Sequence, residues 1–297
     1  MAVLTVFPSL RLTVPGTLYL VATPIGNLAD LSPRAIETLR AAALIACEDT
    51  RTSRPLLSRH GIAAPTLSLH EHNERAAGEK VLRALQEGGD VALVSDAGTP
   101  AISDPGAALV AAAHRAGLRV VPIPGPSAAI AAYCASGFLA DRFLFAGFLP
   151  PRPEKALAAL EAECPVILYE APHRVARTVA ALLERFGPAR EIVIARELTK
   201  KFEEVARMPL AEAPAWLAGP HRDQGEFVLV LGPAPAAPAE DARLAEGLRV
   251  LDILKGSVPP SEAAKLAARI TGAPKNALYE AALREGSARP GKDADST

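Results

Sequence analysis

The sequence predicts an α/β protein made of two successive α/β domains and a small helical unit. Short apolar runs such as 91–94 alternate with segments of helical pattern, which is typical of strands buried in a mostly parallel sheet. Loops rich in Gly, Pro and polar side chains follow these runs, and the loop at 95–106 offers Asp96, Ser103 and Asp104 as acceptors. Parallel sheets bind ligands at the carboxyl ends of their strands, so these loops form the candidate site.

The first α/β domain is expected over 16–124. Its strands are expected where apolar runs are bounded by polar, Gly or Pro residues, at 17–23, 44–47, 66–69, 91–94 and 118–123. The helices between them are expected to end near residues 42, 60, 87 and 116. Ser32 and Pro33 begin the first helix, because Ser is a favoured N-cap and Pro suits the first helical position.

The second α/β domain is expected over 125–232, after an N-terminal extension at 1–15 and the first domain. Its strands are expected at 143–148, 166–169, 191–195 and 226–231, and its helices at 128–136, 154–162 and in a segment that ends at 186. Residues 233–240, rich in Pro and Ala, are expected to be a semi-rigid linker.

Residues 241–286 predict a unit that is similar to a helix-turn-helix, followed by a disordered tail at 287–297. Its last two helices are expected at 261–270 and 275–284, and a preceding helix carries Leu244, Leu248 and Leu251 on its apolar face. Between positions 255 and 284 there are five Lys or Arg and two Glu, a local charge of +3. Two interpretations stay open, an RNA-binding unit and a hairpin that only packs.

The composition excludes several classes of protein. The 297 residues contain 32 Lys and Arg and 33 Asp and Glu, a net charge of −1, which argues against binding nucleic acid by bulk charge alone. The three cysteines are widely spaced and predict neither a disulfide framework nor a zinc site. No apolar stretch reaches the roughly 18 residues of a membrane span, and the first residues lack the pattern of a signal peptide. We therefore expect a cytoplasmic protein without membrane contact.

Ionisable side chains are concentrated at the ends of the expected strands. The segments are E-D-T-R at 48–51, H-E-H-N-E at 70–74, E-A-P-H-R at 170–174 and R-E-L-T-K-K at 196–201. Taken singly, each is typical of a solvated loop or a helix cap. Because strand ends meet at one edge of a parallel sheet, we expect them to converge on one crevice.

Other site types find little support in the sequence. His70 and His72 could ligate a metal, but no third ligand has a telling spacing, so no metal is expected. The chain has no G-x-S-x-G nucleophile elbow, no G-x-G-x-x-G after the first strand and no Walker P-loop. These absences argue against a serine hydrolase, a dehydrogenase and a P-loop nucleotidase.

Six motifs in colinear order resemble a known family. They are L-V-A-T-P-I-G-N-L at 20–28, C-E-D-T-R at 47–51, V-S-D-A-G-T-P-A-I-S-D-P-G at 94–106, P-I-P-G-P-S-A at 122–128, Y-E-A-P-H-R at 169–174 and A-R-E-L-T-K at 195–200. Over about 16–285 the chain resembles the ribosomal RNA small subunit methyltransferase I family of the tetrapyrrole-methylase superfamily. The resemblance implies two α/β domains of that type, with S-adenosylmethionine bound in the cleft between them. It also implies 2′-O-methylation of a cytidine in small-subunit (16S) rRNA by a homodimer.

The resemblance also implies a set of cofactor-binding residues. They are Pro24, Asp96, Gly98, Thr99, Ile102, Ser127, Ala128, Tyr169, Ala195 and Arg196. The tetrapyrrole branch has G-D-P where this chain has Gly98, Thr99 and Pro100, which separates the chain from the cobalt-precorrin enzymes.

Methyl transfer to a ribose in RNA needs a proton acceptor and side chains that bind the RNA. A 2′-hydroxyl is a weak nucleophile, so a carboxylate or histidine should take its proton, and the candidates are Glu48, Asp49, Glu170 and His173. Positive side chains would hold RNA phosphates, and the candidates are Arg51, Arg174, Arg196, Lys200 and Lys275. For each of them an intra-loop ion pair is the alternative. The expected partner is small-subunit rRNA or the 30S subunit. A methyltransferase for a small tetrapyrrole and a non-enzymatic ribosome-assembly factor remain the rival hypotheses.

Overall fold

The computed structural model describes residues 14–160, 163–234, 239–255 and 257–286. The chain divides into two compact units, Met1–Ala234 and Pro235–Thr297, which we call the first and second unit. Nearly all of the expected N-terminal extension, half of the expected linker and the expected tail lie outside the described residues. The α/β fold with a C-terminal helical unit is as the sequence predicts.

The first sheet is wholly parallel, with the strand order β3-β2-β4-β1-β5. Its strands are β1 (Thr17–Val21), β2 (Leu44–Cys47), β3 (Thr66–Ser68), β4 (Val91–Val94) and β5 (Arg119–Ile123). Strand β4 is buried at every residue and lies at the centre. The apolar run from which we predicted a buried strand therefore forms the middle of the sheet.

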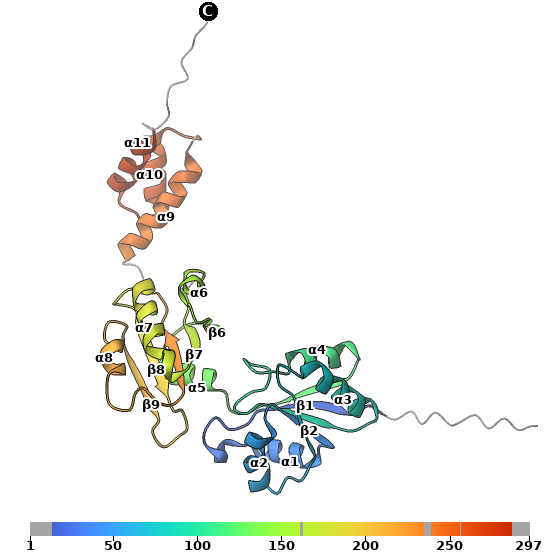
Figure 1. The fold of residues 1–297 in the computed structure, drawn as a ribbon. Coiled ribbons are helices and arrows are strands. Elements are labelled where there is room, and N and C mark those ends of the chain that lie inside the picture. Colours follow the sequence, from blue (N-terminus) through green and yellow to red (C-terminus); the bar gives the residue numbers. More distant parts are fainter. Residues whose placement is uncertain (1–13, 161–162, 235–238, 256, 287–297) are drawn as a thin grey trace, which may run out of the picture. The chain divides into compact units, whose positions relative to one another are not determined.

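Four helices cover the two faces of this sheet (Figure 1). Helices α1 (Pro33–Ala41) and α2 (Thr50–Arg59) pack with one set of strand side chains, and α3 (Glu74–Gln86) and α4 (Ala107–Arg115) with the other. Successive side chains of a strand point to opposite faces, so Val94 joins the first cluster and Leu93 the second. Ser32 caps α1 as predicted, its Oγ accepting the Ala35 amide hydrogen at 3.1 Å.

The second sheet is mixed, with the order β6-β7-β10-β8-β9. Its strands are β6 (Leu144–Phe148), β7 (Val166–Glu170), β8 (Glu191–Arg196), β9 (Glu204–Pro209) and β10 (Phe227–Leu231). Strand β10 runs antiparallel to both of its neighbours, β7 and β8, and β9 runs antiparallel to β8. The ends of β6, β7 and β8 still share one edge, because these three strands point the same way.

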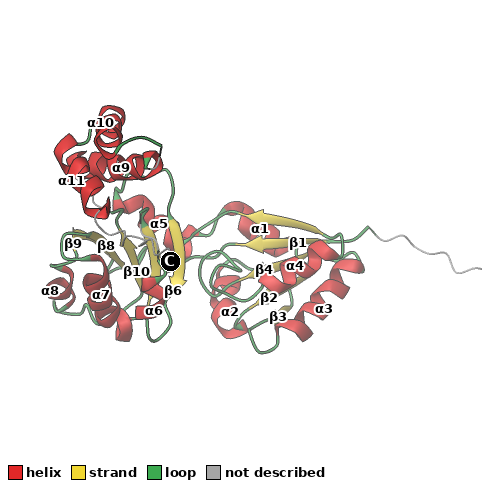
Figure 2. Ribbon diagram, turned by 90° about the horizontal axis from the view of Figure 1, so that it is seen from above, coloured by secondary structure: helices red, strands yellow, loops and turns green. Residues whose placement is uncertain are grey.

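Helices also cover both faces of the second sheet (Figure 2). Helices α6 (Glu154–Ala158), α7 (Pro172–Phe186) and α8 (Ala213–Leu217) supply one apolar cluster, and α5 (Ala128–Ser136) supplies the other. The sequence analysis missed β9 and α8. Strand β9 is an edge strand whose side chains alternate in exposure, so it shows no continuous apolar run. Helix α6 is shorter than predicted.

The second unit consists of three helices around a small core rich in alanine. They are α9 (Ala239–Leu254), α10 (Pro260–Thr271) and α11 (Lys275–Gly286). Helix α10 ends at Gly272, which has a φ of +70°, a conformation that glycine adopts readily. The prediction of the apolar face of α9 is partly wrong. Leu251 is buried and Leu244 is partly buried, as predicted, but Leu248 is exposed. The two-helix crossing expected around the turn is present.

Candidate active site

A cavity of about 360 Å³ lies in the first unit, and residues near both of its sheets line it. The wall consists of the loops after β1 and β4, the start of α5, the ends of β6 and β7, and the start of β10. Its size falls in the range of small-molecule sites, roughly 300–1,000 Å³. The lining residues are Ile25, Asp96, Ala97, Gly98, Thr99, Ile102, Ser103, Asp104, Ser127, Ala128, Phe148, Tyr169, Glu170, Ala171, Leu198, Glu226, Phe227 and Val228.

The loop after β4 is held against the loop after β1 by a short antiparallel bridge. The amide of Thr23 donates to the Gly98 carbonyl oxygen at 2.9 Å, and the Gly98 amide donates back to Thr23 at 3.1 Å. Gly98 has a φ of +83°, and the non-glycine residues Ala101 and Ser103 have φ values of +65° and +62°. Each such non-glycine residue costs about 1–3 kcal/mol, and backbone strain of this kind gathers at ligand sites.

The start of α5 faces the cavity through Ser127 and Ala128. No side chain caps this helix start, so its first amide groups have no side-chain acceptor at the N-cap. The Ala129 amide donates to the Tyr169 hydroxyl oxygen at 3.3 Å, and Thr99 Oγ1 donates to the Pro126 carbonyl oxygen at 3.1 Å. These two bonds join the helix start to both sides of the cavity wall.

Aromatic rings form one wall of the cavity. The ring of Phe148 packs edge-on against Tyr169, with a centroid distance of 5.5 Å, and Phe148 remains 55% exposed. Burial raises the pKa of the Tyr169 hydroxyl, and the negative charge of Asp104 adds to that rise. Tyr169 therefore stays a neutral hydroxyl at physiological pH.

Two carboxyl groups near the cavity have raised pKa values. Burial is the main cause for Asp104, and the neighbouring charge of Asp96 adds to it. Burial is also the main cause for Glu48, followed by the charges of Asp96, Asp104 and Asp49. Like charges and desolvation both disfavour an ionised carboxylate, so this side of the cavity attracts positive charge and protons.

The structure brings seven of the ten predicted cofactor-binding residues to the cavity. They are Asp96, Gly98, Thr99, Ile102, Ser127, Ala128 and Tyr169. Pro24 precedes the lining residue Ile25 but does not itself line the cavity, and Ala195 is fully buried in β8.

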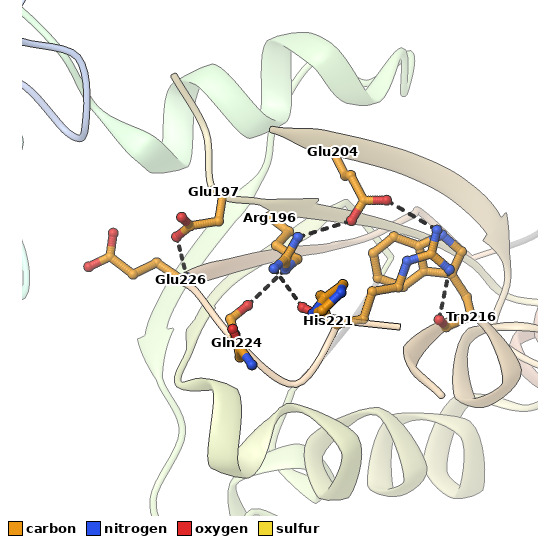
Figure 3. A network of polar contacts seen from close by, with 8 residues as sticks. Arg196, Glu197, Glu204, Trp216, His221, Gln224 and Glu226 are labelled. Carbon is orange, nitrogen blue, oxygen red and sulfur yellow. Dashed lines mark hydrogen bonds and ion pairs between the residues drawn. The ribbon is translucent and has the colours of Figure 1, made fainter. Parts of the chain in front are cut away.

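Arg196 does not line the cavity, and its side chain lies in a network of polar contacts (Figure 3). Its guanidinium donates to the carbonyl oxygens of His221 at 2.6 Å and Gln224 at 2.8 Å, and it pairs with Glu204 at 3.2 Å. Glu204 also pairs with Arg222 at 3.1 Å. Because Arg196 is only 7% exposed, its charge holds the loop before β10 and is not placed to meet a cofactor or a phosphate.

Glu170 lies at the cavity, but its side chain is fully buried in other contacts. One oxygen accepts the Thr178 hydroxyl at 2.5 Å, and the other accepts the Ala171 amide at 2.9 Å. The Arg174 guanidinium pairs with this carboxylate at 3.1 Å and also donates to the Leu149 carbonyl oxygen. Glu170 and Arg174 therefore fasten β7 to α7, and both of their charges are compensated there.

The other predicted proton acceptors lie outside the cavity wall. Asp49 forms an ion pair with Arg51 at 2.7 Å, and this neighbour lowers the pKa of the Asp49 carboxyl to about 2. The Arg51 side chain remains 88% exposed. Glu48 is partly buried after β2, and His173 is exposed in the first turn of α7. None of these side chains lines the cavity.

The two predicted lysines have different surroundings. Lys200 pairs with Glu197 and Glu226, each at 2.8 Å, and its stem packs close to Gly26 in the loop after β1. Lys275 lies in the second unit, exposed at the start of α11. The side chain of Lys200 is thus compensated by two carboxylates.

Ten of the eighteen cavity residues lie outside the set of site residues predicted from the sequence, and Phe148 and Asp104 are two of them, although Asp104 is among the acceptors expected in its loop. Phe148 lies at the end of an aromatic strand, and Asp104 belongs to the polar loop after β4. Phe148 is the last residue of the aromatic run at 143–148, and Asp104 is a carboxylate of the loop that follows the run at 91–94; these positions are the signals that could have identified them. Within the described part of the chain, no three His, Cys, Asp or Glu are grouped to hold a metal ion. The same part contains no helix with the length and apolarity of a membrane span.

Comparison with protein families assigns both units. Residues 17–214 match the model described as Tetrapyrrole (Corrin/Porphyrin) Methylases, and residues 241–286 match one described as RsmI C-terminal HTH domain. The first match alone covers well over half of the chain.

The chain belongs to the tetrapyrrole methylase family.

Several curated proteins are similar to this methylase over almost their whole length. A Pseudomonas aeruginosa protein is 50% identical over 91% of this chain and 97% of its own. A Xylella fastidiosa protein is 49% identical over 90% of this chain and 99% of its own. An Escherichia coli O157:H7 protein is 47% identical over 91% of this chain and 96% of its own. All three are named Ribosomal RNA small subunit methyltransferase I. The family resemblance found in the sequence motifs is confirmed.

Solved structures show the same fold at lower sequence identity. The methyltransferase CobJ has a TM-score of 0.55 at 23% identity and covers 74% of this methylase and 95% of its own chain. A uroporphyrin-III C-methyltransferase from Thermus thermophilus, solved with S-adenosylhomocysteine, has a TM-score of 0.52 at 17% identity, with coverages of 73% and 97%.

Members of the tetrapyrrole methylase family use S-adenosylmethionine, and the residues of this cavity suit that molecule. The lining includes no Lys or Arg, and of its four acidic residues Asp96 and Asp104 form no ion pair with a Lys or Arg of the described chain, which favours a positively charged sulfonium. The start of α5 offers amide groups to a carboxylate, and Ile25 and Ile102 offer apolar contact to a purine ring. The methylase would hold its cofactor with these residues.

The buried ion pair of Glu170 generates a prediction about stability. Glu170→Ala should lower the free energy of unfolding by about 3–5 kcal/mol, because it leaves the Arg174 guanidinium without its carboxylate in a mostly buried place. Urea unfolding followed by circular dichroism measures the change.

The matched control is Glu79→Ala, which breaks the exposed pair with Arg75 and should cost less than about 1 kcal/mol. A Glu170→Ala protein of unchanged stability that no longer transfers methyl groups would return Glu170 to the catalytic candidates.

Proposed function

We propose that this methylase transfers the methyl group of S-adenosylmethionine to the ribose 2′-hydroxyl of a cytidine in small-subunit (16S) ribosomal RNA. The observation that carries the proposal is the 50% identity to a protein named Ribosomal RNA small subunit methyltransferase I, over 97% of that protein's length. The cytidine and the 2′-oxygen rest on the motifs that resemble that family.

The cavity has a place for a nucleobase beside the cofactor. Phe148 is an exposed aromatic residue on the wall, and single-stranded RNA is commonly recognised by bases stacked on such rings. A base stacked there would bring its ribose close to the loop after β4. Phe148 would thus position the substrate, and the cavity would admit one nucleoside of a loop or bulge.

The chemistry requires little beyond alignment and a proton acceptor. The sulfonium of the bound cofactor supplies an activated methyl group. Gly98, Thr99 and the start of α5 would orient the cofactor end of the cavity, and the apolar lining would exclude water from the reacting atoms. Holding the ribose oxygen about 3 Å from the methyl carbon contributes much of the rate gain, because the reaction becomes effectively unimolecular.

The second unit would hold the RNA that surrounds the target. Lys265, Arg269 and Lys275 are exposed on α10 and at the start of α11, beside the exposed apolar side chains of Ile270 and Tyr279. Cations bind phosphates, and aromatic side chains stack on unpaired bases. The partner would be small-subunit rRNA, alone or in the 30S subunit.

The protein would act as a homodimer through the edge of its second sheet. Strand β6 is an edge strand, and it exposes Leu144, while Phe143 just before it and Leu139 further upstream are also exposed. An exposed edge strand with apolar side chains is a ready surface for pairing with another chain. A second copy of this chain would cover it.

The rival hypotheses from the sequence receive less support. Relatives at 43–50% identity are named as rRNA methyltransferases, whereas the solved corrin and porphyrin enzymes share 16–23% identity with this chain. The match of residues 241–286 to a C-terminal HTH domain further separates the chain from those enzymes.

Loss of the protein should remove a single ribose methyl group. Mass-spectrometric mapping of small-subunit rRNA from cells that lack the methylase should show one cytidine without its 2′-O-methyl group, and a plasmid copy should restore it. If every 2′-O-methylated cytidine persists in those cells, the proposed function is wrong. A purely RNA-binding assembly factor would give that negative result.

The dimer proposal predicts a change of mass. Sedimentation equilibrium should give twice the chain mass for the native protein, and Leu139→Asp combined with Leu144→Asp should give the mass of one chain, because the charges would be buried in the interface. Ile253→Asp in the second unit, where the side chain is 65% exposed, is the control and should leave the dimer intact. A native protein of single-chain mass would refute the dimer.

The RNA-binding role of the second unit predicts a change in salt dependence. Lys275→Ala should weaken RNA binding and reduce the slope of log K against log salt by about 0.7–0.9, the contribution of one phosphate contact. Filter binding or fluorescence anisotropy at several salt concentrations measures it. Arg75→Ala in the first unit removes an equally exposed charge and is the matched control. Equal slopes for both variants and the native protein would favour the hairpin that only packs.

A further inference from the structure

Four acidic residues line the cavity, and three of them have their charges engaged elsewhere. Glu170 is neutralised by Arg174 at 3.1 Å, and Glu226 by Lys200 at 2.8 Å. Asp96 is exposed to solvent and accepts the amide hydrogen of Asp49 at 3.2 Å. The fourth acidic residue, Asp104, is in a different situation.

Asp104 is partly buried, and no Lys or Arg of the described chain forms an ion pair with it. The Ser95 hydroxyl, which donates to the Gly98 carbonyl oxygen at 3.1 Å, lowers the pKa of the Asp104 carboxyl. Burial outweighs that effect and raises the pKa of Asp104, with a further rise from Asp96. An uncompensated charge in such a place destabilises the fold, so its retention points to a task in the cavity.

The backbone holds Asp104 in that position. Ser103, directly before it, has a φ of +62°, and Pro105, directly after it, restricts the conformation of Asp104 itself. The next residue, Gly106, donates its amide hydrogen to the Glu74 carboxylate at 2.9 Å. The loop is thus fixed on both sides of Asp104.

The neighbours of Asp104 are those of a reacting group. Its charge reaches the Tyr169 hydroxyl and raises the pKa of that group, and Phe148, the expected platform for the base, lies against the Tyr169 ring at 5.5 Å. Asp104 and Phe148 line the same cavity, and the residues directly before them, Ser103 and Gly147, lie close together, so a nucleoside stacked on Phe148 would share the cavity with this carboxylate.

We propose that Asp104 is the proton acceptor of the methyl transfer, a catalytic role that rests on the ribose methylation proposed above. The ribose 2′-oxygen forms a bond to the methyl carbon while the bond from that carbon to sulfur breaks, and the electron pair of the broken bond stays on sulfur. The proton of the 2′-hydroxyl passes to a carboxylate oxygen of Asp104 and then to solvent. The charges balance, because the positive sulfonium becomes a neutral thioether as the proton is released.

The surroundings of Asp104 suit this role better than those of the four acceptors expected from the sequence. A general base works best with a pKa close to the working pH. The pKa of Asp49 is instead held at about 2 by Arg51, and Glu170 is fully buried in its ion pair. Glu48 also has a raised pKa but does not line the cavity, and His173 does not line it either.

Three titratable groups face Asp104 and shape its pH dependence. They are Asp96 in the same loop, Glu48 after β2 and Tyr169 on β7. The negative charge of Asp96 opposes ionisation of Asp104, the charge of Asp104 in turn raises the pKa of Glu48, and Tyr169 remains neutral. The methylation rate of the native enzyme should therefore rise once as the pH increases and then level off. The midpoint of that rise should lie above the usual pKa of an aspartate.

Asp104→Asn tests the proposal in the full-length protein. Single-turnover methylation of small-subunit RNA should slow by about 10²–10⁴-fold, the usual contribution of a general base. The affinity for S-adenosylmethionine in calorimetry should stay within about twofold, and the melting temperature should be unchanged or higher, because a buried charge is removed. The rising limb of the pH–rate profile should disappear. Asp104→Ala should be slow as well and should regain part of its rate when formate is added.

The matched control is Glu48→Gln, which removes a carboxylate whose pKa is also raised but which does not line the cavity, and it should keep the rise of the rate with pH. A native rate for Asp104→Asn would overturn the proposal. So would a loss of cofactor affinity with an unchanged rate at saturation, which would assign Asp104 to binding the cofactor's positive charge. If Asp104→Asn does not fold, the formate response of Asp104→Ala decides. If the native protein itself does not methylate the RNA, the proposed function fails before Asp104 is tested.

Discussion

The pair of hydrogen bonds between Thr23 and Gly98 is the constraint on which the site depends. It joins the loops that follow two neighbouring strands, β1 and β4, at the centre of a parallel sheet. Once those loops are joined, the segment from Gly98 to Asp104 has to turn back sharply, and Ala101 and Ser103 take left-handed conformations to do so. The turn carries Thr99 to Pro126, which leads directly into α5. The cavity wall is thus a consequence of pairing two strand ends.

Most of the charged side chains in the polar loops form ion pairs and hydrogen bonds that hold the loops themselves. Arg196 binds the two backbone carbonyls of the segment before β10, Arg174 holds Glu170, and Lys200 joins Glu197 to Glu226. Each pair lies partly out of water, where losing one partner is costly. The sequence motifs dense in ionisable residues are therefore mainly a scaffold, and few of their charges remain to act on a ligand.

A feature could be predicted from the sequence when the residues that form it lie close together in the chain. The run 91–94 was predicted to its exact ends as a strand, because an apolar run between Gly and polar residues is a local signal. The glycine- and proline-rich loops were predicted as a site for the same reason, and seven of the ten predicted cofactor residues meet at the cavity. The orientation of Arg196 could not be predicted, because its acceptors lie 25 and 28 residues away along the chain. Strand β9 was missed because its partner β8 buries only part of its side chains.

The place of β10 in the second sheet bears on how the chain acquires its structure during synthesis. All strands that the described residues contribute to the first sheet end by Ile123, so their pairings can form while the remainder of the chain is still being made. The second sheet is different, because its central strand is the last in sequence. Until Phe227–Leu231 has left the ribosome, β7 and β8 both lack their neighbour, and the pairs β6-β7 and β8-β9 each keep an open inner edge. A translational pause before residue 231 would prolong that exposed intermediate, whereas a pause soon after residue 123 would give a finished domain time to fold.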